Sequence, residues 1–212
     1  MKDMQSQKGR NNVIFNLFRK GKTESVSLEM QIQTLIDLGV TFNLSDAELI
    51  KGLTDQFDRQ VYEEDPYRLL ISVAGTDLLD NNGNELRLSY DILSFDTECV
   101  EDEYIYTDVI TQFLRLAKLE NYISELDSKV NFNEETAYIT FLFEQKRYKW
   151  NISFDSDWFD VSVLERMASV IERPNMKFIY FNDGQHLTLM YCSKAVFKQI
   201  NNLTKNKFRM LA

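Results

Sequence analysis

The apolar residues of this 212-residue chain change their spacing near residue 120, and this change constrains the fold more than any other feature. Before it, apolar side chains recur every three or four residues, as Ile105, Val109 and Phe113 do, which is the spacing of one helix face. After it, apolar and polar side chains alternate, which is the pattern of a half-buried strand. The sequence therefore predicts an α+β fold, with a helical N-terminal half packed with an antiparallel sheet.

The individual elements follow from the same spacing, together with residues suited to starting or ending a helix. Helices are predicted over residues 27–38, 45–57, 65–74, 102–119 and 160–172, and from Ser193 onward. Strands are predicted over residues 128–132, 137–143, 148–154, 177–181 and 186–192. The stretch Leu69–Ile71 is equally compatible with a strand. The expected architecture is an antiparallel sheet of about five strands, a helical N-terminal half and two C-terminal helices.

Two turns are marked by their residue types. Asn81–Asn84 is predicted to be a turn, and the Asp183-Gly184 pair is typical of a two-residue type I′ hairpin. That hairpin would place His186 opposite Phe181. A lone histidine at the start of a strand is more often a satisfied polar residue than a catalytic base.

The net charge of −9 conceals a strong segregation of charge along the chain. Residues 1–22 carry a net charge of +5, residues 23–192 carry −19, and residues 193–212 carry +5. We interpret residues 1–24 as a basic mobile tail and residues 25–212 as a single domain. The acidic body argues against a nucleic-acid partner, because affinity for phosphates comes from Lys and Arg.

Composition excludes several other kinds of site. One histidine and two cysteines are too few for the usual zinc sites. An EF-hand loop that began at Asp155 would have Asp160 and Arg166 where the loop needs Gly and Glu, so no metal or cofactor is expected. No apolar run approaches the roughly 20 residues of a membrane span, so no membrane partner is expected either. Cys99 and Cys192 are interpreted as reduced core thiols of a cytoplasmic protein, whose oligomeric state the sequence leaves open.

Two acidic stretches stand out within the body of the chain. Seven acidic residues and no Lys or Arg lie between Ser89 and Leu114, which is typical of a solvated face or a helix start, and also of a surface that steers a basic partner. The second stretch, Asp155–Asp160, contains Trp158 and Phe159. It is either a capped helix start whose aromatic residues pack onto the sheet, or an exposed acidic-aromatic contact surface.

Four short stretches resemble a family of uncharacterised bacterial proteins: Asp65–Leu70, Phe95–Val100, Arg147–Trp150 and Asp157-Trp158. The resemblance covers about residues 28–211 and implies a bacterial cytoplasmic setting, but no activity. As a class, small acidic α+β proteins without catalytic motifs are also similar to the immunity proteins of bacterial toxin systems. Those proteins bind their toxins through acidic surfaces that carry aromatic side chains. This second similarity is one of composition, and it implies no role for any particular residue.

Together these features lead to the hypothesis of an acidic protein-binding module, an immunity-type inhibitor that occludes a basic partner protein such as a toxin. The residues expected to contact the partner are Asp96, Glu98, Glu101, Asp102, Glu103, Tyr104, Asp108, Asp157 and Trp158. The alternative is a hydrolase or other enzyme with a carboxylate-based site that lacks a short motif. Asp96, Glu98 and His186 are the candidate groups for that alternative.

Overall fold

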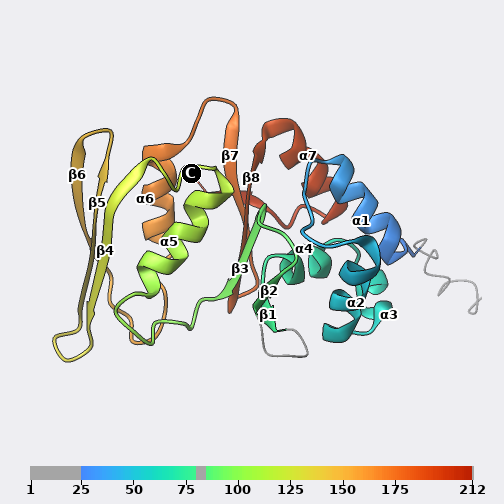
Figure 1. Ribbon diagram of the computed structural model, residues 1–212, viewed down its shortest axis with the longest axis horizontal. Coiled ribbons are helices and arrows are strands. Elements are labelled where there is room, and N and C mark those ends of the chain that lie inside the picture. Colours follow the sequence, from blue (N-terminus) through green and yellow to red (C-terminus); the bar gives the residue numbers. More distant parts are fainter. Residues whose placement is uncertain (1–24, 80–84, 212) are drawn as a thin grey trace, which may run out of the picture.

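The computed structural model describes residues 25–79 and 85–211. The predicted basic tail, residues 1–24, and the predicted turn Asn81–Asn84 lie outside these ranges. Within them the chain forms four layers, which Figure 1 shows from right to left as helices, a sheet, two helices and a second sheet. The α+β fold class expected from the sequence is confirmed.

The first layer holds the N-terminal helices α1 (Leu28–Asp37), α2 (Asp46–Gln56), α3 (Arg59–Glu64) and α4 (Arg68–Ala74), together with the C-terminal helix α7 (Lys194–Leu203). Local sequence signals set two of the starts. Ser27 accepts a hydrogen bond from the backbone N–H of Met30, and Ser45 forms the expected capping box with Glu48. Because α4 includes Leu69–Ile71, the strand alternative for that stretch is excluded.

The central sheet separates the two hydrophobic cores of the protein. It contains β3 (Ile92–Asp96), β8 (His186–Ser193), β7 (Met176–Asn182) and β9 (Arg209–Met210), in that order and all antiparallel. Ile92, Ile179 and Met190 lie in the core shared with α1–α4. Phe178 and Leu189, from the alternate positions of β7 and β8, lie in the core shared with the third layer.

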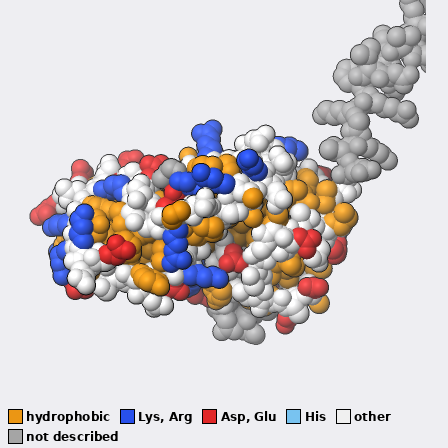
Figure 2. Space-filling view, turned by 90° about the horizontal axis from the view of Figure 1, so that it is seen from above, with side chains coloured by type: hydrophobic (Ala, Val, Ile, Leu, Met, Phe, Trp, Pro, Cys, Tyr) orange, Lys and Arg blue, Asp and Glu red, His pale blue; other side chains and the backbone are white. Residues whose placement is uncertain are grey.

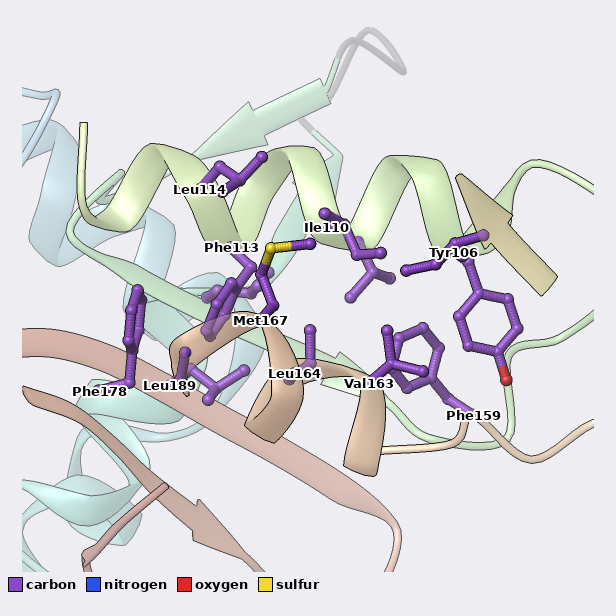
Figure 3. Packing of buried hydrophobic residues seen from close by; sticks show 14 of the residues in the cluster. Tyr106, Ile110, Phe113, Leu114, Phe159, Val163, Leu164, Met167, Phe178 and Leu189 are labelled. Atoms are coloured by element: carbon purple, nitrogen blue, oxygen red, sulfur yellow. The ribbon is translucent and has the colours of Figure 1, made fainter. Parts of the chain in front are cut away.

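The third layer consists of α5 (Ile105–Leu116) and α6 (Ser162–Ile171), which pack between the two sheets. Figure 3 shows Ile110 and Phe113 of α5 facing Val163 and Met167 of α6 in this core. Phe113 also stacks on Phe178 of the central sheet, with 4.0 Å between the ring centroids. The fourth layer is the meander β4 (Ile123–Asn131), β5 (Thr136–Phe143) and β6 (Lys146–Ile152).

The expectation of one sheet of about five strands is wrong. All five predicted strands form, but the first three make the β4-β5-β6 sheet and the last two belong to the central sheet. The reason is that both sheets present an apolar face to the α5–α6 pair, and alternation along a strand does not reveal which partner its apolar face meets. A further small sheet, β1 (Asp77–Leu79) with β2 (Glu85–Arg87), and the short strands β3 and β9 were not predicted.

The register predicted for the β7–β8 hairpin is also wrong. Phe181 lies opposite Thr188, and His186 lies opposite Asp96 of β3. The hairpin turn is closed by a hydrogen bond from the backbone N–H of Asp183 to the carbonyl of His186, which makes Gly184 the first of its two central residues. Gly184 has a φ of 108° there but Gln185 does not have a positive φ, so the turn is not the predicted type I′, which needs a positive φ at both central residues.

The two predicted C-terminal helices are confirmed as α6 and α7, whereas α5 is shorter than the predicted helix over 102–119. Its start is set by Asp102, whose Oδ1 accepts hydrogen bonds from the backbone N–H groups of Tyr104 and Ile105. Its end is set by Lys118, whose φ of 56° lies in the left-handed region.

Candidate functional site

Four loops meet at one end of the two sheets, at the bottom of Figure 1. They are residues 96–104 between β3 and α5, 132–135 between β4 and β5, 153–161 between β6 and α6, and 182–186 between β7 and β8. We call these four loops the acidic end. Together they contain eleven Asp and Glu residues and no Lys or Arg.

Backbone hydrogen bonds fix two of these loops against each other. The N–H of Val100 donates to the carbonyl of Asp157 at 2.8 Å, and the N–H of Phe159 donates to the carbonyl of Thr97 at 2.7 Å. Between these bonds, Glu98 pairs with Trp158 in an isolated antiparallel bridge. The two acidic stretches of the sequence, which are some 50 residues apart, are therefore held side by side.

The β7–β8 turn joins the same end through Gln185. The carbonyl of Gln185 accepts hydrogen bonds from the backbone N–H and the hydroxyl of Thr97, at 2.7 and 2.6 Å. Its side-chain amide donates to the Oδ2 of Asp96 at 3.1 Å. These contacts tie the central sheet to the loop that leads into α5.

The β4–β5 turn completes the acidic end and forms a hollow with its neighbours. The hollow has a volume of about 560 Å³ and is lined by Val100, Phe132, Glu135, Phe154, Asp155, Ser156 and Asp157. Its apolar part includes an edge-to-face pair of aromatic rings, Phe132 and Phe154, whose centroids are 6.0 Å apart. Its charged part consists of three carboxylates and no basic side chain.

Some of the eleven carboxylates have structural roles and others do not. Asp96, Asp102, Asp160 and Asp183 accept hydrogen bonds from backbone N–H groups and so hold their own loops. Six others form no ion pair or hydrogen bond through their side chains with the described residues: Glu98, Glu101, Glu134, Glu135, Asp155 and Asp157. All of these six except the half-buried Asp157 are exposed.

Three large aromatic side chains are exposed among these carboxylates. The exposed fractions are 58% for Tyr104, 46% for Phe132 and 38% for Trp158. The neighbouring Phe159, by contrast, is buried and stacks on Tyr106 at 4.4 Å. The packing interpretation of this stretch therefore holds for Phe159, whereas Trp158 is at the surface, and its role in contacting a partner stays a prediction.

The opposite end of the same sheets has a different charge. Figure 2 views that end from above and shows Lys and Arg side chains gathered over its middle. Its segments are 117–122, 144–147, 172–177 and 193–194, and they contain six basic and three acidic residues. The loops at one end of the sheets thus have an excess of negative charge, and those at the other end have an excess of positive charge.

Two pKa values reflect the negative charge of the acidic end. Burial raises the pKa of the Cys99 thiol to about 11, and the nearby carboxylates of Asp96 and Glu101 add to that shift. The pKa of Tyr104 is raised by its hydrogen bond to Glu103 and by the charges of neighbouring carboxylates. In both cases a second negative charge is disfavoured where carboxylates already gather.

Eight of the nine residues expected to contact a partner lie in the acidic end, all except Asp108. Asp108 is in the first turn of α5 and lines a separate cavity of about 660 Å³ beside β3, together with Asp96 and Cys99. Sequence reasoning missed Phe132 and Glu135 of the hollow. A signal for them existed, because the first turn of a three-stranded meander lies at the same end as the exit of its third strand.

The residues of the enzyme alternative are neighbours, but no described cavity is lined by all three of them. Asp96 lies opposite His186 in the ladder, and the N–H of Glu98 donates to Asp96. His186 instead lines a cavity of about 360 Å³ beside α4, with its Nδ1 3.8 Å from the Oδ1 of Asp183. Backbone N–H groups of His186 and Gln185 lower the pKa of Asp183 in spite of its partial burial.

Other kinds of site find no support in the part of the chain that the structure describes. No group of three or more His, Cys, Asp or Glu residues is arranged to hold a metal ion there. None of the described helices is long and apolar enough to cross a membrane. Cys99 and Cys192 are both free thiols, the first half-buried and the second buried.

Comparisons with protein-family models, with curated proteins and with solved structures gave no match to the chain.

Proposed function

We propose that the protein is a binding module whose acidic end docks on a basic partner protein and occludes it, as an immunity-type inhibitor does. The observation that carries this proposal is the hollow between Phe132, Phe154 and Asp155. It combines an apolar wall with three carboxylates, and none of the residues that line it is Lys or Arg. Carboxylates that form no contact within the described chain are available to a partner.

The chemistry of the hollow suits the side chain of a lysine or arginine. The aliphatic stem would lie against Phe132 and Phe154, and the cationic head would reach Glu135, Asp155 or Asp157. Such a contact is desolvated on its apolar side and charge-paired on the other, which is the character of an interface hot spot. Trp158 and Tyr104 would pack on the partner next to it, because aromatic side chains are strong interface anchors.

The charges of the loops at the two ends of the sheets support the same orientation of docking. One set of loops has eleven acids and no Lys or Arg, the other has six bases and three acids, and this difference favours the approach of a positive surface to the acidic end. Complementary charge raises the rate of association, and it does so most at low ionic strength. We therefore expect partner binding to weaken as salt is added.

The test is capture of the partner from extracts of the source cell by the full-length protein, with elution by salt and identification by mass spectrometry. The test variant is Glu101→Lys with Asp155→Lys, since both residues are exposed and neither holds a loop. The matched control is Asp37→Lys with Glu64→Lys, which makes the same change in net charge on exposed positions of α1 and α3.

We expect the wild type and the control to capture the same basic protein and the test variant to lose it, with the affinity lowered by about a hundredfold. The captured protein should also lose its own activity in the complex, because occlusion blocks its working surface. Capture that is insensitive to ionic strength, or that is equal for the test variant and the control, would rule out docking through the acidic end.

A further inference from the structure

A second charged feature lies away from the hollow of the acidic end, where the turn after α7 meets the end of β7. A cavity of about 530 Å³ is lined there by Tyr180, Phe181, Asn182, Lys205, Asn206, Lys207 and Arg209. Three of these seven residues are basic and none is acidic. In a chain with 33 acidic and 24 basic residues, such a group of bases is not a consequence of composition.

The three bases are not neutralised within the described chain. Lys205, Lys207 and Arg209 are exposed, and none of them forms an ion pair with a described residue. Like charges that share one cavity repel each other. An anion in the cavity would relieve that repulsion.

The backbone that carries these bases is fixed in place. Asn201 accepts hydrogen bonds from the N–H of Asn206 through its carbonyl, at 2.7 Å, and from the N–H of Phe208 through its side chain, at 2.9 Å. Phe208 is buried, and β9 then pairs with β7 so that Arg209 lies opposite Tyr180. The positions of the bases are therefore organised before any ligand binds, which lowers the entropic cost of binding.

The uncharged polar groups of the cavity can also donate hydrogen bonds. The Oδ1 of Asn182 already accepts a hydrogen bond from the N–H of Gly184, so the amide NH₂ of the Asn182 side chain remains as a donor. The hydroxyl of Tyr180 and the side-chain amide of Asn206 add further donors. The cavity thus offers positive charge and N–H and O–H donors, and no carboxylate.

We propose that this cavity binds a small anion that carries phosphate groups. A phosphate monoester has about two negative charges at neutral pH and strong acceptor oxygens, which match the three bases and their neutral donors. The volume is within the range of small-molecule sites. The cavity shares only Asn182 with the acidic end, so this inference does not depend on the proposed function. The acidic body of the chain disfavours a nucleic acid as the source of the phosphate.

The experiment is calorimetric titration of the full-length protein with pyrophosphate at constant ionic strength, with inorganic phosphate and a short single-stranded oligonucleotide as the other arms. The test variant is Lys207→Gln with Arg209→Gln. The matched control is Lys194→Gln with Lys198→Gln, which removes two exposed bases of α7 that do not line the cavity. Thermal unfolding of each variant verifies that it folds.

We expect saturable binding of pyrophosphate to the wild type and to the control, weakened by about tenfold in the test variant. A second variant, Asn182→Asp, retains the acceptor for Gly184 but places a carboxylate in the cavity, and it should also weaken binding. Absence of saturable pyrophosphate binding, or equal affinity of the test variant and the control, would overturn the proposal. So would an oligonucleotide that binds while pyrophosphate does not.

Discussion

The two ends of the sheet layers are built from the same elements but differ in charge. At the acidic end, the loops carry eleven acidic residues and no Lys or Arg, whereas the opposite end mixes six bases with three acids. At the opposite end only two of the six bases form ion pairs with described residues, Lys177 with Glu172 and Arg147 with Glu125 of β4. At the acidic end most carboxylates have no partner among the described residues.

The carboxylates of the acidic end divide into those that stabilise the fold and those that do not. Asp102 and Asp160 hold backbone N–H groups at the starts of α5 and α6, so they stabilise the helices. The side chains of Glu101 and Asp155 form no ion pair or hydrogen bond with the described residues, and neighbouring carboxylates repel them. A cluster that the fold does not require, beside exposed aromatic rings, is the pattern of a surface kept for binding.

The largest effect is expected where the acidic end depends on the core. Phe159 is 5% exposed, stacks on Tyr106 and lies next to the bonds that join the two acidic loops. Phe159→Ala should lower the free energy of unfolding by about 3 kcal/mol, because it leaves a cavity in a packed site. Tyr122→Ala at the opposite end, where the ring is 64% exposed, should cost less than about 0.5 kcal/mol.

Urea denaturation of both variants tests this contrast. If Phe159→Ala lowered the free energy of unfolding as little as Tyr122→Ala, the two acidic loops would not be anchored through Phe159. The acidic end could then not be treated as one rigid surface.

Much of the fold could be predicted from the sequence because the signals are local. The capping box at Ser45 located α2, and the alternation from Ala137 to Phe143 located β5 almost to the residue. By contrast, β3 is a short buried run inside an acidic stretch, and β9 has only two residues, so neither carries a periodic signal.

Most residues of the acidic end could be predicted from the sequence, but the contacts that bring them together could not. The sequence identified the residues from Asp96 to Tyr104 and around Trp158, but their meeting depends on bonds such as Val100 to Asp157, which link distant parts of the chain. Such pairing depends on how the layers stack, and no local pattern encodes it. Phe132 was missed because it was predicted to end the strand 128–132, whereas β4 ends at Asn131 and Phe132 lies exposed in the turn that follows.

A smaller effect should distinguish the two thiols. Burial raises the pKa of Cys99 to about 11 and that of Cys192 to about 12, but only Cys99 also has carboxylates, Asp96 and Glu101, that raise it. At pH 8 the thiolate fraction of Cys99 should be about a hundredfold below that of an ordinary thiol, and Asp96→Asn with Glu101→Gln should increase it. The reaction of Cys99 with a thiol reagent, followed against pH in a Cys192→Ala background, measures this.

The same shift has a consequence for stability. Because the folded state holds the Cys99 proton more tightly than the unfolded state, the stabilisation is complete below about pH 9 and is lost as the pH rises through about 11. Unfolding curves at pH 8 and pH 11 should show this loss. If Asp96→Asn with Glu101→Gln left the reactivity of Cys99 unchanged, these two carboxylates would have no effect on the pKa of the Cys99 thiol.

The smallest effect concerns repulsion between the carboxylates of the acidic end, which we expect to lower the stability of the fold. Glu101→Gln with Asp155→Asn removes two like charges from a crowded surface and should raise the melting temperature by about 1–2 °C at low salt. Glu125→Gln with Glu144→Gln removes one charge from β4 and one from the opposite end, and because Glu125 pairs with Arg147 this variant should not raise the melting temperature. The gain should disappear near about 0.5 M salt, because screening removes repulsion between exposed charges. A gain in stability confined to the first variant is the result expected if these charges are retained for the proposed binding role. Equal melting temperatures for the two variants would mean that the carboxylates of the acidic end do not destabilise the fold.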